Sequence, residues 1–199
     1  MRAIKKCVLF LVMASLLLAV SGFLVRAKQK PIEPEEVEAA VGVQYTADYI
    51  PVSNKRPGIK RQIKYIVIHN TANEESTARN ERDYLTNPNN TSSTSFNIVV
   101  DDREIIEAIP VNEIAFHAGD GEGNQKGIGI ELCESGDFEK TKANAAKLVA
   151  YLMKSYNISL SEVRTHHDFS GKDCPREMLG NWEDFLESVK VAYESLDNI

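Results

Sequence analysis

Residues 64–72 have the sequence KYIVIHNTA, in which a short apolar run leads directly into a histidine. The run from Tyr65 to Ile68 is mostly β-branched and is typical of a buried strand. His69 is then the last side chain of that strand, and a polar turn follows it. The stretch therefore predicts a buried strand that delivers one imidazole to the edge of a sheet.

Strand and helix patterns both alternate and cluster along the rest of the chain. Strands are expected at residues 64–69, 95–100, 104–109, 128–133 and 163–166. Helices are expected at about residues 76–85, 140–156 and 175–193. The junction at residues 101–103 is a turn, so the strands on either side of it should pair as a hairpin. This pattern predicts an α/β or α+β fold with a central mixed sheet flanked by helices.

Length and composition limit the class of protein. The chain has 199 residues, of which 43% are hydrophobic and 26% are charged, and this suits a single globular domain. The formal net charge is -6 and the pI is near 5.3, so there is no basic stripe of the kind that a phosphate backbone attracts. We therefore expect that the protein does not bind nucleic acid. We also expect it to be a monomer.

The N-terminal region has the pattern of an export or anchoring segment. Basic residues precede and follow an uncharged, mostly apolar stretch at residues 7–25, which approaches the roughly 20 residues needed to span a bilayer. Residues 1–27 are thus expected to be a membrane anchor or a cleaved signal peptide, which places the body of the protein outside the cytoplasm. Residues 28–44 contain Pro31, Pro34 and four glutamates and predict a linker, so the folded domain should span residues 45–199.

The stretch HHDFSGKDCP, residues 166–175, places an imidazole and a thiol eight residues apart around a lysine. Catalytic zinc takes three protein ligands and leaves a fourth position for water. The chain has four histidines, and His69 is the best candidate for the third ligand. Neighbouring side chains of an extended segment point to opposite sides, so His166 and His167 should not bind one metal together. The pattern predicts a catalytic zinc site and hydrolysis at neutral pH.

A disulfide between Cys133 and Cys174 is the alternative for an exported chain, because such a protein meets oxidising conditions. A disulfide would remove the thiolate that zinc requires. The two interpretations of Cys174 therefore exclude each other.

Five motifs in order resemble the zinc-dependent N-acetylmuramoyl-L-alanine amidases of type 2, which include phage lytic amidases and are related to peptidoglycan recognition proteins. The resemblance covers roughly residues 45–190. It rests on the motifs IVIHNTA, SFNIVVDD, AFHAGDG, GIGIEL and HHDFSGKDCP. It implies a mixed sheet flanked by helices, one Zn²⁺, and cleavage of the amide between muramic acid and L-alanine of the peptidoglycan stem peptide.

Carried over residue by residue, the resemblance implies zinc ligands at His69, His166 and Cys174. It places Glu131 near the activated water as a general base, and burial should tune such a carboxylate for that task. A structural glutamate paired with a lysine is the alternative. Lys172 matches a lysine that stabilises the oxyanion, whereas a lysine on an exposed loop is otherwise merely solvated.

Two further residues are expected to bind substrate. The histidine that corresponds to His117 lines the substrate groove in the family, although a purely structural histidine is the alternative. Some amidases carry a tyrosine near the zinc where this chain has Phe96, Asn97 and Ile98, so Asn97 is the candidate replacement donor. A polar residue on a half-exposed strand nevertheless needs no such role.

The function implied by the resemblance is that of a peptidoglycan amidase that acts in the cell wall, either secreted or anchored to the membrane. Two other functions remain open on the sequence. The chain could be a peptidoglycan-binding module without turnover, or a zinc endopeptidase that cuts between residues of the stem peptide. The presence of Cys174 argues against the module, because related recognition proteins that lose this cysteine lose hydrolysis.

Overall fold

The computed structural model describes residues 31–119 and 121–196. The predicted signal peptide or anchor, residues 1–27, lies outside these residues. Within the described part of the chain, no helix is both long and apolar enough to cross a membrane. Residues from Pro31 onward form one compact unit.

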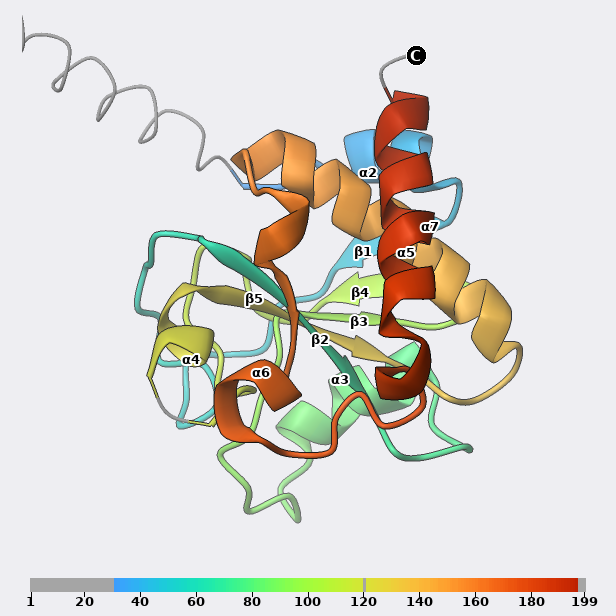
Figure 1. Ribbon diagram of the computed structural model, residues 1–199. Coiled ribbons are helices and arrows are strands. Elements are labelled where there is room, and N and C mark those ends of the chain that lie inside the picture. Colours follow the sequence, from blue (N-terminus) through green and yellow to red (C-terminus); the bar gives the residue numbers. More distant parts are fainter. Residues whose placement is uncertain (1–30, 120, 197–199) are drawn as a thin grey trace, which may run out of the picture. The chain divides into compact units, whose positions relative to one another are not determined.

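A single six-stranded sheet runs through the middle of this unit (Figure 1). Its strands lie in the order β1-β4-β3-β5-β2-β6. Their bounds are β1 (Gln44–Ala47), β2 (Tyr65–Asn70), β3 (Ile98–Val100), β4 (Glu104–Glu107), β5 (Gly127–Leu132) and β6 (Val163–Thr165). Only β3 and β4 pair antiparallel, and all other neighbours are parallel. The predicted mixed sheet is confirmed.

The predicted hairpin is also confirmed, and Asp101 explains its tight turn. The Asp101 carboxylate accepts hydrogen bonds from the backbone N–H groups of Arg103 and Glu104, each at 2.8 Å. Such a side chain replaces backbone partners in a turn. The antiparallel register that follows pairs Val100 with Ile105.

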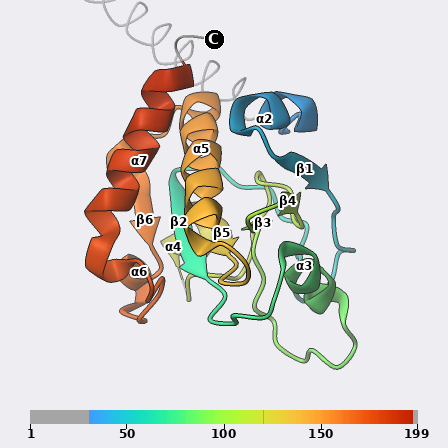
Figure 2. The same cartoon turned by 90° about the vertical axis from the view of Figure 1, so that its right-hand side faces the viewer.

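Helices cover both faces of the sheet. They are α2 (Pro34–Val41), α3 (Ala78–Thr86), α4 (Glu122–Lys126), α5 (Phe138–Tyr156), α6 (His167–Ser170) and α7 (Trp182–Ser195). Figure 2 shows α7, α5 and α2 side by side on one face, whereas α3 lies against β3 and β4 from the other. The long helix α5 begins where Asp137 caps the backbone N–H of Lys140 and ends where Asn157 adopts a left-handed conformation.

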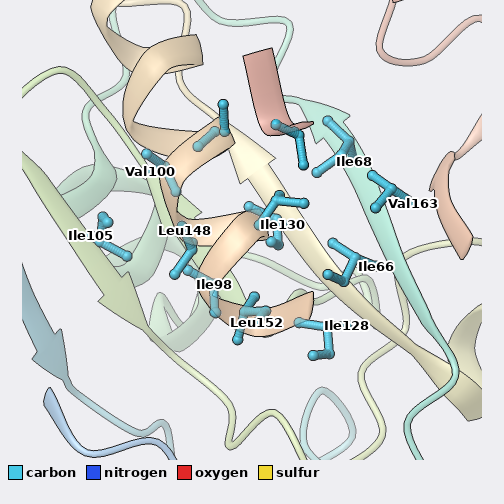
Figure 3. Packing of buried hydrophobic residues seen from close by; sticks show 14 of the residues in the cluster. Ile66, Ile68, Ile98, Val100, Ile105, Ile128, Ile130, Leu148, Leu152 and Val163 are labelled. Carbon is cyan, nitrogen blue, oxygen red and sulfur yellow. The ribbon is translucent and has the colours of Figure 1, made fainter. Parts of the chain in front are cut away.

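The main hydrophobic core fills the space between the sheet and α5 (Figure 3). Ile66 and Ile68 of β2 are register partners of Ile128 and Ile130 of β5, so all four project to this face. They belong to one buried cluster with Leu148 and Leu152 of α5. Because side chains alternate along a strand, the intervening positions must face the opposite side. The candidate site occupies that opposite face.

Part of the predicted linker, residues 28–44, is helical instead, because residues 34–41 form α2 and pack on the domain. Ile32, Val37 and Val41 are buried in the main core, and Pro34 occupies the first turn of the helix. The helix ends at Gly42, which is left-handed with φ of 76°. The four glutamates that suggested a linker are all exposed, one as the N-cap and three on the helix, so the spacing of the apolar residues decided the structure.

The last helix begins at Trp182 rather than near Pro175. After Pro175 the chain forms a tight turn, in which the N–H groups of Met178 and Leu179 donate to the Pro175 carbonyl, and then a 3₁₀ segment, Leu179–Asn181. The N–H of Arg176 donates to the side-chain oxygen of Asn70 at 2.9 Å, which ties this turn to the end of β2.

We predict that Val37→Ala in the full-length chain lowers the free energy of unfolding by about 1 to 3 kcal/mol, because it leaves a cavity in the core. Urea denaturation measures this change. Glu35→Ala, on the exposed side of the same helix, is the matched control and should change stability by no more than about 0.5 kcal/mol. Equal effects of the two variants would show that α2 is not part of the folded core.

Candidate active site

The candidate site lies where three neighbouring parallel strands end. His69 and Glu131 are register partners in β2 and β5, so their side chains project from the same face of the sheet. His166 directly follows β6, and its N–H donates to the carbonyl of Ile68 at 3.2 Å. Carboxyl ends of parallel strands commonly carry ligand sites, because side chains from several strands meet there.

Three possible metal ligands converge at this edge, as the sequence predicted. One ligand atom each of His69, His166 and Cys174 lie within 4.8 Å of one another, and all three residues are buried. Nδ1 of His69 lies 3.7 Å from Sγ of Cys174. Nδ1 of His166 is buried and has no hydrogen-bond partner in the described part of the chain. These three residues can hold a metal ion.

His167 does not join this cluster. Its side chain is exposed, and its ring Nδ1 donates to the carbonyl of Lys172 at 3.0 Å. The physical reason differs from the expected one, because His166 is not extended. It has helical angles, φ of -58° and ψ of -34°, and stands at the start of α6. The sharp turn from β6 into α6 separates the two rings.

The loop that carries Cys174 is tied to the sheet by groups that the sequence analysis did not single out. The side-chain oxygen of Asn70 accepts the N–H of Arg176, and its amide nitrogen donates to Glu134. Glu134 also accepts the N–H of Ala72 at 2.8 Å and an N–H of the Arg176 guanidinium at 3.3 Å. Asn70 ends β2 and Glu134 closely follows β5, so their positions at strand ends were the available signal.

Glu131 faces the same cleft without a fixed partner. Its Oε2 atom is buried and has no hydrogen bond, and no ion pair of this residue occurs within residues 31–119 and 121–196. The alternative of a structural pair with a lysine therefore fails. Burial, with a smaller contribution from Glu81, raises the pKa of Glu131 to about 8, and the charge of Lys172 acts in the opposite direction.

The cleft has a volume of about 480 Å³. The three possible ligands and Glu131 line it together with Lys172, whose side chain is exposed. The walls come from separate loops and include Ser93, Thr94, Phe116, Gly119, Ser170 and Arg176. A larger groove of about 780 Å³ lies mainly between α5 and α7 and shares no residue with this cleft.

The structure does not support the prediction that Asn97 binds substrate, because its side chain does not line the cleft. Its side chain is fully buried, and its amide nitrogen donates to the carbonyls of Ile109, Pro110 and Glu113 at 3.1 to 3.3 Å. Its oxygen accepts the N–H of Gly129 at 3.1 Å and an N–H of a buried arginine. A side chain with all of its hydrogen bonds satisfied inside the protein has none to offer a substrate.

His117 lines the cleft, but its ring nitrogens bind groups of the protein itself. It is only 4% exposed, and both ring nitrogens are used within the protein. Nδ1 lies 3.0 Å from Nε2 of His69, and Nε2 lies 3.1 Å from the carbonyl oxygen of Gly127. Burial lowers the pKa of His117 to about 3, so the ring is neutral at pH 7. It forms part of the cleft wall but has no free nitrogen for a substrate hydrogen bond.

The disulfide alternative is contradicted, because Cys133 and Cys174 are both free. Cys133 belongs to the second buried cluster, with Val99 and Ile106 among its members. Cys174 instead faces His69. Burial raises the pKa of the Cys174 thiol to about 11, while the nearby Lys172 lowers it.

Comparisons with known proteins agree with this geometry. The family model described as N-acetylmuramoyl-L-alanine amidase matches residues 59–177. The N-acetylmuramoyl-L-alanine amidase CwlH of Bacillus subtilis strain 168 is 45% identical over 153 residues, which cover 73% of this chain and 60% of CwlH. XlyA of the same strain, also named N-acetylmuramoyl-L-alanine amidase, is 47% identical over 154 residues, or 74% of this chain and 51% of XlyA.

A solved structure extends this similarity to the fold. The catalytic domain of XlyA superposes with a TM-score of 0.71 at 45% identity, and the match covers 74% of this chain and 99% of that domain. The chain thus spans about half to three fifths of the length of these two curated relatives and nearly the whole of the solved catalytic domain. On this sequence and structural evidence, the chain belongs to the type 2 N-acetylmuramoyl-L-alanine amidase family.

Proposed function

We propose that the protein is a zinc-dependent peptidoglycan hydrolase that cleaves the amide between N-acetylmuramic acid and L-alanine of the stem peptide. The observation that carries this proposal is the convergence of His69, His166 and Cys174 in one cleft with Glu131. Membership of the family supports the reaction class, as does the similarity to CwlH and XlyA, which are both named N-acetylmuramoyl-L-alanine amidases.

The donor set fits Zn²⁺ better than a hard cation. Two imidazoles and one thiolate are the nitrogen and sulfur ligands that zinc prefers, and three protein ligands leave a fourth position open. Nδ1 of His166 is a buried polar atom without a hydrogen-bond partner, and a bound metal ion would supply that partner. When bound, Zn²⁺ supplies a Lewis acid that polarises a carbonyl and lowers the pKa of water from 15.7 to about 7.

Glu131 is proposed to transfer a proton from the attacking water to the leaving amine. A dication held by the neighbouring ligands would attract the carboxylate form and lower its raised pKa, so that Glu131 can accept a proton from the attacking water. Glu131 then passes this proton to the nitrogen of the leaving amine as the amide bond breaks. Proton transfer by a positioned carboxylate of this kind contributes roughly 10² to 10⁴ in rate.

Lys172 is proposed to stabilise the oxyanion that forms when water attacks the amide carbonyl. Its side chain is exposed and lines the cleft, so the ammonium group can reach a bound substrate. A covalent intermediate is not part of the proposal. Cys174 is assigned to the metal, and the hydroxyl of Ser170 contacts the His166 carbonyl and the Lys172 N–H, neither of which is a base.

The proposed substrate places the reaction outside the cytoplasm, in the cell wall. The basic and apolar pattern of residues 1–27 supports this location, either as an anchor or as a cleaved signal peptide. No role in nucleic-acid binding is proposed, since the chain carries a net charge of -6.

Digestion of purified muropeptides by the full-length chain, followed by mass spectrometry, tests the proposed reaction. We expect products with a new L-alanine amino terminus, loss of activity in a chelator, and recovery when Zn²⁺ is added back. A different new amino terminus would identify an endopeptidase. Binding of muropeptides without any product would identify a binding module, and either result would contradict the amidase.

We predict that Glu131→Gln lowers kcat by about 10² to 10⁴ while one Zn²⁺ per chain remains bound, because the amide keeps size and polarity but cannot act as a base. Steady-state kinetics and metal analysis measure the two quantities. Glu183→Gln, on the exposed side of α7, is the matched control and should retain the wild-type kcat. Near-normal turnover of the Glu131 variant with zinc bound would reject the catalytic role.

Glu131 should also make the stability of the metal-free protein depend on pH. Its pKa is about 8 in the folded state and near 4.5 when unfolded, so between these values the folded chain holds a proton that the unfolded chain releases. Stability is therefore lost as the pH rises through this window, by up to about 1.4 kcal/mol per pH unit from this group.

The comparison of wild type with Glu131→Gln isolates this effect. Urea denaturation in chelator at pH 5 to 8 should show the variant becoming progressively more stable than wild type as the pH rises. The buried histidines have lowered pKa values, so their contribution makes the free energy of unfolding rise with pH. This contribution is the same in both proteins and cancels in the comparison. If the free energies of unfolding of the two proteins changed with pH in parallel over this range, Glu131 would be ionised in the metal-free fold.

A further inference from the structure

A continuous chain of hydrogen-bonding groups runs from a backbone carbonyl to the candidate metal site. The carbonyl oxygen of Gly127 lies 3.1 Å from Nε2 of His117, and Nδ1 of His117 lies 3.0 Å from Nε2 of His69. At the far end, Nδ1 of His69 lies 3.7 Å from Sγ of Cys174. Both rings are buried, with exposures of 4% for His117 and 2% for His69.

The carbonyl of Gly127 fixes the direction of each hydrogen bond in this row of groups. A carbonyl oxygen can only accept, so Nε2 of His117 must carry the proton. A neutral imidazole has one ring proton, so Nδ1 of His117 is an acceptor and Nε2 of His69 is the donor to it. Nδ1 of His69 is then left with its lone pair, and this atom faces Cys174.

The fold holds the His117 ring in the position in which it can bond both the Gly127 carbonyl and His69. A Cβ atom at Gly129 would lie 2.5 Å from Cγ of His117, so the ring packs directly on a strand position that has no side chain. The side-chain oxygen of Asn124 accepts the backbone N–H groups of His117 and Ala118, at 2.8 and 2.7 Å. The His117 and His69 rings meet edge to face, with an interplanar angle of 89°.

We propose that His117 is a positioning residue that fixes His69 in the tautomer with a protonated Nε2 and so presents its Nδ1 lone pair to the metal. The proposal rests on the proposed role of His69 as a metal ligand. It assigns His117 a function that is neither substrate binding nor metal ligation. Partners that orient a ligating histidine typically contribute a factor of 10 to 100 in metal affinity.

His117→Leu and His117→Asn form a matched pair that tests this role. The two side chains have nearly the same shape, but only asparagine has an oxygen near the position of Nδ1 that can accept from His69. We expect the full-length His117→Leu variant to bind Zn²⁺ 10 to 100 times more weakly than wild type in a competition titration with a chromophoric chelator. His117→Asn should recover most of that loss.

Controls separate this role from a loss of folding and from a failure of the proposed function. His167→Gln removes an exposed histidine at the start of α6, outside the ligand cluster, and should bind Zn²⁺ within about threefold of wild type. Equal Zn²⁺ affinity of the leucine and wild-type proteins would overturn the positioning role. Absence of Zn²⁺ binding by wild type would instead overturn the proposed zinc site.

A spectroscopic measurement on wild type tests the tautomers without any substitution. The chain contains four histidines, so their ring nitrogens can be assigned individually in long-range ¹H–¹⁵N spectra of the metal-free protein at neutral pH. We expect Nε2 to be protonated and Nδ1 to be unprotonated in both His69 and His117. A protonated Nδ1 in His69 would overturn the proposal, even if the leucine variant failed to fold.

Discussion

The parallel pairing of β2 with β5 is the constraint on which the candidate site depends. It makes His69 and Glu131 register partners, so a possible metal ligand and a possible base project side by side from one face. The same register places Ile68 beside Ile130 on the opposite, buried face. A shift of one residue would move all of these side chains to the wrong face, so burial of the isoleucines against α5 also fixes the geometry of the site.

The polar face of the sheet is supported by hydrogen bonds that leave few groups unsatisfied. Asn97 braces Gly129 of β5, Asn124 holds the loop before α4, and Asn70 anchors the loop after Cys174. Against this background, the unpartnered atoms of Glu131 and His166 stand out. Glu131 and His166 both line the cleft, whereas the third unpartnered atom of the described residues, the hydroxyl of Tyr45, lies outside it. A metal or substrate bound in the cleft would supply the partners that the atoms of Glu131 and His166 lack.

Much of the fold and the donor set could be predicted from local sequence. Apolar runs identified β2 and β5, and the spacing in the segment from His166 to Cys174 identified two ligands that meet His69. Predictions failed where distant contacts decide the structure. The glutamate-rich segment forms α2 because Val37 and Val41 reach the main core.

The sequence by itself determined five of the six strands, the chemistry of the possible ligands and the family, because these depend on residue types, on short-range periodicity and on ordered motifs. Only the tertiary structure decided that Gln44–Ala47 pairs with β4 as β1, and that the side chains of Asn97 and His117 form their hydrogen bonds within the protein. The reason is that hydrogen bonds such as that between His69 and His117 join residues 48 positions apart. No local pattern encodes such a contact, since it forms only when strands and loops from separate parts of the chain pack against one another.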